Sequence, residues 1–267
     1  MNRIDSTFKR LKEEKRKALI LFLSAGDPDI NTTEKLIPPL FDAGADIIEI
    51  GVPFSDPLAD GPTIQYSFIR ALNKGITLGK ILTMVKSVRK RTDKPLVLMS
   101  AFNLIYSYGI EAFAIAASKA GVDGVILPDL IPEEAKNVIP IFKKHGLHTI
   151  FLAAPTSGKE RISKISRSSG GFLYYISVKG ITGHKKPDIG EIKSQVSLIR
   201  TVTKLPVACG FGISNPKQAQ DIARVTDGVI IGSALVKILG ENSSASTKLK
   251  SGIKFVESIR KAIDRIN

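Results

Sequence analysis

A carboxylate lies inside an apolar run near the first fifth of the chain, and a loop with two further carboxylates follows it. In "DIIEIGVPFSDPLADGP", Glu49 stands among isoleucines, and Asp56 and Asp60 lie in a segment stiffened by prolines. No basic residue falls between Asp46 and Arg70, so we expect burial to raise the pKa of Glu49. Such a carboxyl group suits general acid–base catalysis near neutral pH. The structural alternative is a buried acid that pairs with a more distant lysine or arginine.

Three glycine-bearing loops offer backbone amides to an anion. They are "VKGITGHKKPD" (178–188), "CGFGIS" (209–214) and "IIGSALV" (230–236). The first is long and polar, as expected of a lid over a substrate. The Gly-Ser pair of the third opens an apolar helical segment, whose N-terminal amides and positive dipole end favour phosphate. Any one of these glycines could simply form a turn, but together they predict a phosphorylated substrate.

Histidine and cysteine are too few and too scattered to predict a metal site. His145, His148 and His184 have no ligand spacing, and Cys209 is the single cysteine. We therefore expect no metal and no intramolecular disulfide. The residues predict an enzyme that uses carboxylates on a small phosphate ester.

Apolar, β-branched runs alternate with helical patterns along the whole chain. We expect strands at 19–25, 46–51, 95–101, 124–129, 148–154, 171–177, 206–212 and 227–233. Continuously apolar strands separated by helices indicate a parallel sheet that is covered on both faces. Eight such units predict an α/β fold, a (β/α)₈ TIM barrel, with its active site at the C-terminal ends of the strands.

The helical patterns complete this barrel and add elements to it. We expect helices near 32–44, 62–73, 77–91, 111–120, 132–145, 158–168, 189–203, 215–224 and 247–266, an extra N-terminal helix near 3–15, and an extra short helix after the eighth strand. The segment 240–248, "GENSSASTK", is typical of a flexible surface loop. An open doubly wound sheet is the alternative, but its G-x-G-x-x-G fingerprint is absent after the first strand. We expect one domain over residues 1–267.

The composition describes a basic chain without membrane-spanning runs. Its 267 residues carry a net charge of +14, and 43% of them are hydrophobic. The basic residues fall on separate amphipathic segments and do not alternate with aromatic residues, so solvated helix faces are favoured over nucleic-acid binding. The longest apolar stretches run to fewer than ten residues, and the charged N-terminus has no signal-peptide pattern. We expect a cytoplasmic protein.

The stretch "IEIGVPFSDPLADGPTIQ" resembles the signature of the tryptophan synthase alpha subunit family. The resemblance runs through the whole chain, in "FLSAGDP" (22–28), "RAL" (70–72), "AGVDGVILPDL" (120–130), "GITG" (180–183), "GFGIS" (210–214) and "GSALVK" (232–237). It implies retro-aldol cleavage of indole-3-glycerol phosphate to indole and glyceraldehyde 3-phosphate. It also implies that indole passes to a beta subunit in an α₂β₂ heterotetramer. The beta subunit would hold pyridoxal phosphate (PLP), and this chain would hold no cofactor.

The same resemblance assigns roles to individual residues. It implies catalytic roles for Glu49 and Asp60, with Asp60 near the indole nitrogen. The implied substrate-binding residues are Phe22, Tyr174, Thr182, Gly183, Phe211, Gly212, Gly232 and Ser233. The implied partner interface comprises Asp56, Pro57 and Asp129.

The chain also departs from the family. "MSAFN" stands where the family more often has an aromatic pair or triplet before the Asn, and "GHKKPD" adds basic residues to the lid. The net charge of +14 is not expected of the family either. Two other functions are weighed: another phosphate-binding barrel, which the "PFSDPLADGP" stretch argues against, and an alpha-like activating partner of a beta subunit with weak activity of its own.

Overall fold

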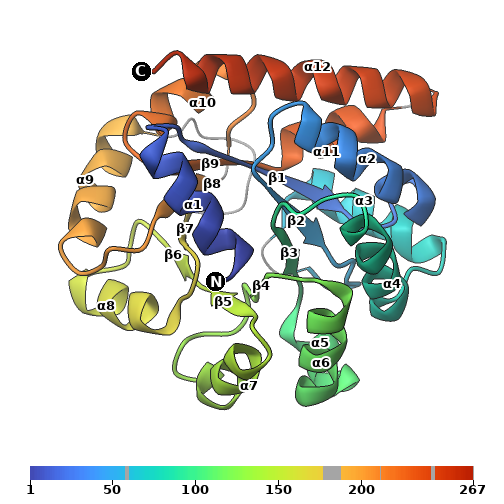
Figure 1. Cartoon of the computed structure of the whole chain (residues 1–267), viewed down its shortest axis with the longest axis horizontal. Coiled ribbons are helices and arrows are strands. Elements are labelled where there is room, and N and C mark those ends of the chain that lie inside the picture. The colour runs from blue at the N-terminus through green and yellow to red at the C-terminus, as the bar shows by residue number, and fades with distance from the viewer. Residues whose placement is uncertain (58–59, 177–187, 211, 242–243, 267) are drawn as a thin grey trace.

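The strands of the protein form one parallel sheet (Figure 1). The computed structural model describes residues 1–57, 60–176, 188–210, 212–241 and 244–266. In these residues the strands are β1 (Ala18–Ser24), β2 (Ile47–Gly51), β3 (Leu96–Met99), β4 (Gly124–Ile126), β5 (His148–Ile150), β6 (Leu152–Ala153), β7 (Leu173–Ile176), β8 (Val207–Gly210) and β9 (Gly228–Ile231).

The order of the strands closes the sheet almost completely. The order is β5-β4-β3-β2-β1-β9-β8-β7-β6, with parallel pairing throughout. β5 and β6 stand at opposite ends of this order, yet only Phe151 separates them in the chain. The sheet is therefore a nearly closed barrel, which confirms the predicted TIM-barrel fold.

The helices surround this barrel. They are α1 (Arg3–Glu13), α2 (Ile30–Asp42), α3 (Pro62–Asn73), α4 (Leu78–Arg89), α5 (Phe102–Tyr108), α6 (Ile110–Ala120), α7 (Val138–Lys144), α8 (Lys159–Ser168), α9 (Ile189–Arg200), α10 (Pro216–Ala223), α11 (Ser233–Gly240) and α12 (Ala245–Asp264), with a 3₁₀ turn at Ala135–Asn137. Both predicted additions are present: α1 precedes the first strand, and α11 follows the last. Within the described part of the chain, no helix has the length and apolarity needed to cross a membrane.

Alternation along each strand divides the core into two layers. In β1, Leu19 and Leu21 pack in the layer between the sheet and its helices, while Ile20 belongs to a second cluster inside the barrel. Ile4 and Phe8 of α1 belong to this inner cluster, so α1 closes one end of the barrel (Figure 1). That end is formed by the N-terminal ends of the strands, and the opposite end is left for the site.

Several predicted boundaries are wrong. The strand expected at 148–154 is interrupted at Phe151, whose amide lies 3.3 Å from the Ser169 hydroxyl. The helix expected at 132–145 becomes α-helical only at Val138, after the 3₁₀ turn at Ala135–Asn137. The loop expected at 240–248 is also too long, since α12 begins at Ala245.

α5 is a helix that the sequence patterns do not predict. It has seven residues, too few for a periodic pattern to stand out. Its first amide, that of Phe102, donates to both carboxylate oxygens of Asp129 at 3.0 and 2.9 Å. A contact 27 residues away in sequence thus supports its N-terminus.

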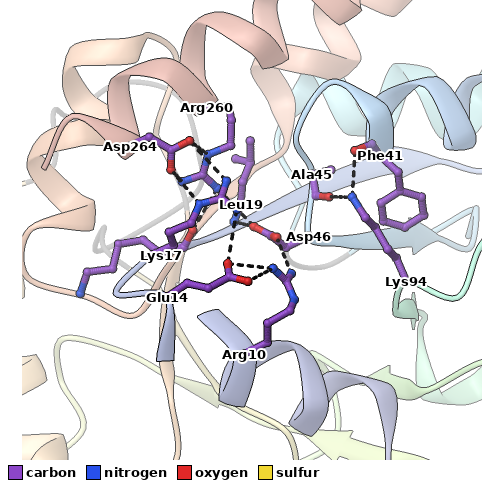
Figure 2. A network of polar contacts seen from close by, with 11 residues as sticks. Arg10, Glu14, Lys17, Leu19, Phe41, Ala45, Asp46, Lys94, Arg260 and Asp264 are labelled. Atoms are coloured by element: carbon purple, nitrogen blue, oxygen red, sulfur yellow. Dashed lines mark hydrogen bonds and ion pairs between the residues drawn. The ribbon is translucent and has the colours of Figure 1, made fainter. Parts of the chain in front are cut away.

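A network of polar contacts ties the last helix to the first strands (Figure 2). Asp46 is buried and accepts the Leu19 amide at 2.9 Å and the Arg260 guanidinium at 3.2 Å. Arg260, also buried, donates to both carboxylate oxygens of Asp264 and to the Lys17 carbonyl. These residues lie before or at the N-terminal ends of the strands, so the network stabilises the closed end of the barrel.

Candidate active site

Glu49 lies on the central part of β2 and faces the barrel interior. Its neighbour Ile47, two residues before it, belongs to the inner cluster, whereas Ile48 and Ile50 pack in the outer layer. Its relative exposure is 0%, and neither carboxyl oxygen has a hydrogen-bond partner among the described residues. Burial raises the pKa of Glu49 to about 8. The group is therefore mostly protonated at neutral pH and can donate a proton.

Asp60 ends the loop after β2 and stands two residues before α3 begins at Pro62. Its carbonyl accepts the side-chain amide of Gln65 at 2.8 Å, which ties this end of the loop to the helix. Burial raises the pKa of Asp60 to about 6. The carboxyl is only partly buried, and at neutral pH it is mostly ionised. The structure thus gives the two carboxyl groups different protonation states, the condition for one acid and one anion in the same site.

Two adjoining cavities, of about 60 and 240 Å³, open at the C-terminal ends of the strands. Both are lined by Phe22, Asp60 and Met99. The smaller one is also lined by Gly61, Ile64, Tyr174, Gly212, Ile213, Ile230, Gly232 and Ser233. The larger one is also lined by Val52, Phe54, Asp56, Pro57, Phe68, Ser100, Ala101, Pro128 and Asp129. A flat aromatic group fits the mostly apolar walls, and Asp60 is the carboxylate that both cavities share.

Glu49 does not itself line either cavity. It is the register partner of Phe22 on β1, which lines both cavities, and it lies close to Tyr174 on β7. The pKa of Tyr174 is raised well above its usual value, first by burial and then by the negative charges of Glu49, Cys209 and Asp60. The phenol therefore lies in the electrostatic field of both candidate catalytic groups, and it stays protonated.

Two glycines fix the aromatic walls of the site, and the sequence patterns miss both. A Cβ on Gly51 would collide with the ring of Phe22. A Cβ on Gly210 would lie 2.5 Å from the hydroxyl oxygen of Tyr174. Each glycine thus gives its neighbour's ring the space to lie inside the barrel.

The end of the smaller cavity is suited to an anion. Gly232 is the N-cap of α11 and Ser233 is its first residue, and both line the cavity. The first amides of a helix have no intrahelical acceptor, so they point a positive dipole end toward an anion. A Cβ on Gly232 would have its nearest neighbour, the Cβ of Phe22, at 3.6 Å, an ordinary contact distance. The absence of a side chain at Gly232 therefore leaves that space to the cavity. Gly212 has a φ of +76°, a conformation that favours glycine.

The three residues predicted to meet a partner all line the larger cavity. Asp56 and Asp129 are exposed, and Pro57 is partly exposed. Asp129 already has a role in the chain itself, because it holds the N-terminus of α5. Thr182, Gly183 and Phe211 lie outside the described residues, so their predicted roles stay predictions.

Sequence reasoning missed several apolar residues of the walls, among them Ile64, Phe68, Met99 and Ile213. Met99 could have been found, since it is the last residue of a strand and has the same facing as Val97. In the described residues no three His, Cys, Asp or Glu side chains are grouped as a metal site would require.

Comparison with known proteins gives one family across the chain. A family model described as "Tryptophan synthase alpha chain" matches residues 8–264. The tryptophan synthase alpha chain of Geobacter sulfurreducens is 51% identical over 263 residues, which cover 98% of this chain and 99% of the relative. That of Geotalea daltonii is 54% identical over 237 residues, with 89% and 90% covered.

Solved structures agree with these relatives. The tryptophan synthase subunit alpha of Legionella pneumophila superposes with a TM-score of 0.92 at 40% identity, covering 99% of both chains. A chain of Mycobacterium tuberculosis tryptophan synthase superposes with a TM-score of 0.90 at 34% identity, covering 98% of both.

Proposed function

Because the chain belongs to the tryptophan synthase alpha chain family, we propose that Glu49 and Asp60 are the acid–base pair of its active site. The protein is a lyase that cleaves indole-3-glycerol phosphate to indole and glyceraldehyde 3-phosphate in tryptophan biosynthesis. The observation that carries the proposal is the state of Glu49: it is buried, its oxygens have no hydrogen-bond partner among the described residues, and its pKa is raised to about 8.

Protonated Glu49 starts the reaction. It donates its proton to C3 of the indole ring, and N1 then carries positive charge. The carboxylate of Asp60 stabilises this charge from the cavity wall. The ionised Glu49 next removes the proton of the glycerol hydroxyl, so that a carbonyl forms, the C–C bond breaks and its electron pair returns to the ring. Glu49 regains its proton, and the step is balanced without an oxidant or reductant.

Glu49 has to reach the substrate from behind the cavity wall. Its oxygens are held by no hydrogen bond in the described structure, so rotation of the side chain does not break one. We propose that this rotation, past Phe22, brings the carboxyl group to C3. Tyr174 lies beside the path and remains a neutral donor during it.

The two adjoining cavities offer both backbone amides and apolar side chains, which the two ends of the substrate require. We propose that the amides at Gly212, Gly232 and Ser233 bind the phosphate, and that Phe22 and Met99 contact the indole ring. The family pattern predicts that Thr182, Gly183 and Phe211 also bind the substrate. The reaction draws on proton transfers alone, so we propose that this chain acts without a cofactor or metal of its own.

The family implies a beta subunit as partner. We propose an α₂β₂ heterotetramer in which the beta subunit binds PLP and meets the rim formed by Asp56, Pro57 and Asp129. These residues line the larger cavity, so indole leaving the smaller one would pass toward the partner. We further propose that residues 1–267 form one domain and that the protein is cytoplasmic.

The test is an assay of indole release by the purified chain, with and without beta subunit. We expect release by the isolated chain and faster release in the complex. Asp60→Asn should reduce release in both conditions, because Asn keeps the shape but not the charge. Normal release by Asp60→Asn would contradict the assignment. Weak release in both conditions would favour the alternative of an activating partner with weak activity of its own.

A further inference from the structure

A second pair of cavities lies at the closed end of the barrel, opposite the active site. Each has a volume of about 460 Å³, and the first lies between α1 and the segment that joins α9 to β8. Its walls include Lys17, Pro206 and Asp227, which immediately precede β1, β8 and β9. The adjoining cavity shares Phe8, Lys12 and Lys204 with it. Neither cavity contains a residue of the candidate active site.

The walls of the first cavity are strongly cationic. Its charged residues are Lys12, Lys15, Arg16, Lys17, Arg200 and Lys204 on the basic side and Asp227 on the acidic side. Arg200 forms an ion pair with Asp227 at 3.1 Å, and Asp227 also accepts the Val207 amide. The only carboxylate of the wall, within the residues described, is therefore already bound.

Neighbouring carboxylates are also engaged by arginines. Arg16 is paired with Asp264, which Arg260 holds at the edge of the network in Figure 2. Glu14 lies within ion-pair distance of Arg10 and Arg16. These acids do not neutralise the lysines of the cavity.

Four lysines of the wall consequently have no carboxylate within ion-pair distance among the described residues: Lys12, Lys15, Lys17 and Lys204. Lys17 is partly buried and donates to the Thr226 carbonyl at 2.7 Å. Burial lowers the pKa of Lys17, Asp227 opposes this shift, and Arg200 adds to it. Lys12, Lys15 and Lys204 are exposed at the rim of the cavity. Like charges gathered around one cavity repel one another, and a bound anion relieves that repulsion.

The backbone supports a role for the charge at Lys15. This residue follows the C-cap of α1 and has a φ of +55°. Glycine is the usual residue in the left-handed conformation after a helix. Here a lysine that lines the cavity stands in a conformation that disfavours side chains.

From this arrangement we propose that the cavity under α1 binds a compact anion with several phosphate groups. The cations come from two separate walls, the end of α1 and the start of β8, so an extended chain of phosphates can contact both. The volume lies within the range of small-molecule sites rather than of a nucleic-acid groove. A free polyphosphate and the triphosphate of a nucleotide share this chemistry.

Isothermal titration calorimetry on the full chain tests the proposal. The probes are tripolyphosphate, ATP and orthophosphate at one ionic strength, with glyceraldehyde 3-phosphate present to occupy the catalytic phosphate site. We expect saturable binding of tripolyphosphate with one site per chain, and much weaker binding of orthophosphate. Tighter binding of ATP than of tripolyphosphate would identify a nucleotide as the source of the phosphate groups. Tighter binding of tripolyphosphate would identify a free polyphosphate.

A double variant, Lys12→Glu with Lys204→Glu, should raise the dissociation constant of tripolyphosphate by at least about tenfold, since several charge-assisted contacts are lost or reversed. The matched control is Lys86→Glu on α4 with Lys90→Glu at its C-cap, which changes the net charge equally at two exposed positions. It should bind as wild type. Both double variants should release indole at the wild-type rate. Absence of saturable binding, or equal weakening in the two double variants, would overturn the proposal.

Discussion

Glu49 shows how one residue acquires a chemical property from its position. A glutamate at the surface is ionised at neutral pH, but here complete burial raises its pKa to about 8. No cation or hydrogen-bond donor in the described structure compensates for the lost solvation. A buried charge without a partner is costly, so the protein tolerates this residue chiefly in its protonated form.

The first prediction at this scale concerns turnover. Glu49→Gln should lower indole release by about 10²-fold or more, because an amide keeps the volume but cannot exchange the proton. The rate is measured with saturating substrate, and glyceraldehyde 3-phosphate binding serves as the control for an intact site. A variant that keeps more than about a tenth of the wild-type rate would remove Glu49 from the mechanism.

The second prediction concerns stability and pH. The ordinary pKa of 4.5 applies in the unfolded chain, and the folded value is about 8, so between these values the folded state binds more protons. The contribution of Glu49 to the free energy of unfolding is therefore largest below pH 4.5 and falls as pH rises toward 8.

Glu49→Gln removes this dependence. Its free energy of unfolding relative to wild type should increase from pH 5 to pH 8, by an amount on the order of a few kcal/mol. Urea unfolding of wild type and variant at pH 5 and pH 8 measures this difference in free energy. If the difference between the two proteins is the same at both pH values, Glu49 is not the buried acid described here.

At the scale of elements, α5 depends on a residue of another loop. Asp129 accepts the Phe102 amide, and both its carboxylate oxygens are within hydrogen-bond distance. This contact holds the start of α5 beside Ser100 and Ala101, which line the larger cavity.

Asp129→Ala should lower the free energy of unfolding of the isolated chain by about 1 kcal/mol, the usual contribution of a capping side chain. Asp129→Asn keeps an acceptor and should lose much less. Urea unfolding without beta subunit is the measurement. If Asp129 serves only the partner surface, neither variant will change the stability of the isolated chain.

The elements also show what sequence can and cannot predict. Glu49 and the two acids of the following loop can be singled out because an acid in an apolar run and acids in a proline-rich loop are local signals, whereas the choice of Asp60 rests on the family resemblance. The barrel followed from the repeated alternation of strand and helix. α5 was missed because Asp129, which supports it, is distant in sequence, and the interruption at Phe151 has no local signal.

The aromatic walls reveal the same limit. That Gly51 must be a glycine follows from the ring of Phe22, and Gly210 likewise from Tyr174. These pairs lie on neighbouring strands, and their meeting depends on the register of the sheet. A single sequence contains no direct record of that register. The roles of Thr182, Gly183 and Phe211 rest on the family pattern alone, because these residues lie outside the described residues.

At the scale of the whole molecule, the two ends of the barrel have separate tasks. The C-terminal ends of the strands hold the cavities of the candidate active site, and the N-terminal ends are closed by α1 and by the network around Asp46 (Figure 2). In TIM barrels the first end serves activity and the second serves stability.

Arg260→Ala should therefore destabilise the protein by up to about 3 kcal/mol, the lower end of the cost of breaking a buried ion pair, because Asp46 keeps the Leu19 amide and Arg10 at 3.4 Å. Indole release below the unfolding temperature should stay near wild type. The matched control is Lys261→Ala, an exposed position on the same helix, which should change stability little. Equal stability of the two variants, measured by urea unfolding, would show that the network contributes nothing.

The pairing of Asp46 with Arg260 has a consequence for how the protein is made. The two residues are separated by 214 positions, so at ordinary rates of translation roughly 10–45 s pass between their synthesis. During that interval Asp46 lacks Arg260, and β1 has one unpaired edge, since its neighbour β9 is also made late. An open strand edge invites association with other chains. The nascent barrel is therefore most exposed to aggregation while its first half waits on the ribosome for its last, and early contacts with a chaperone would protect that half.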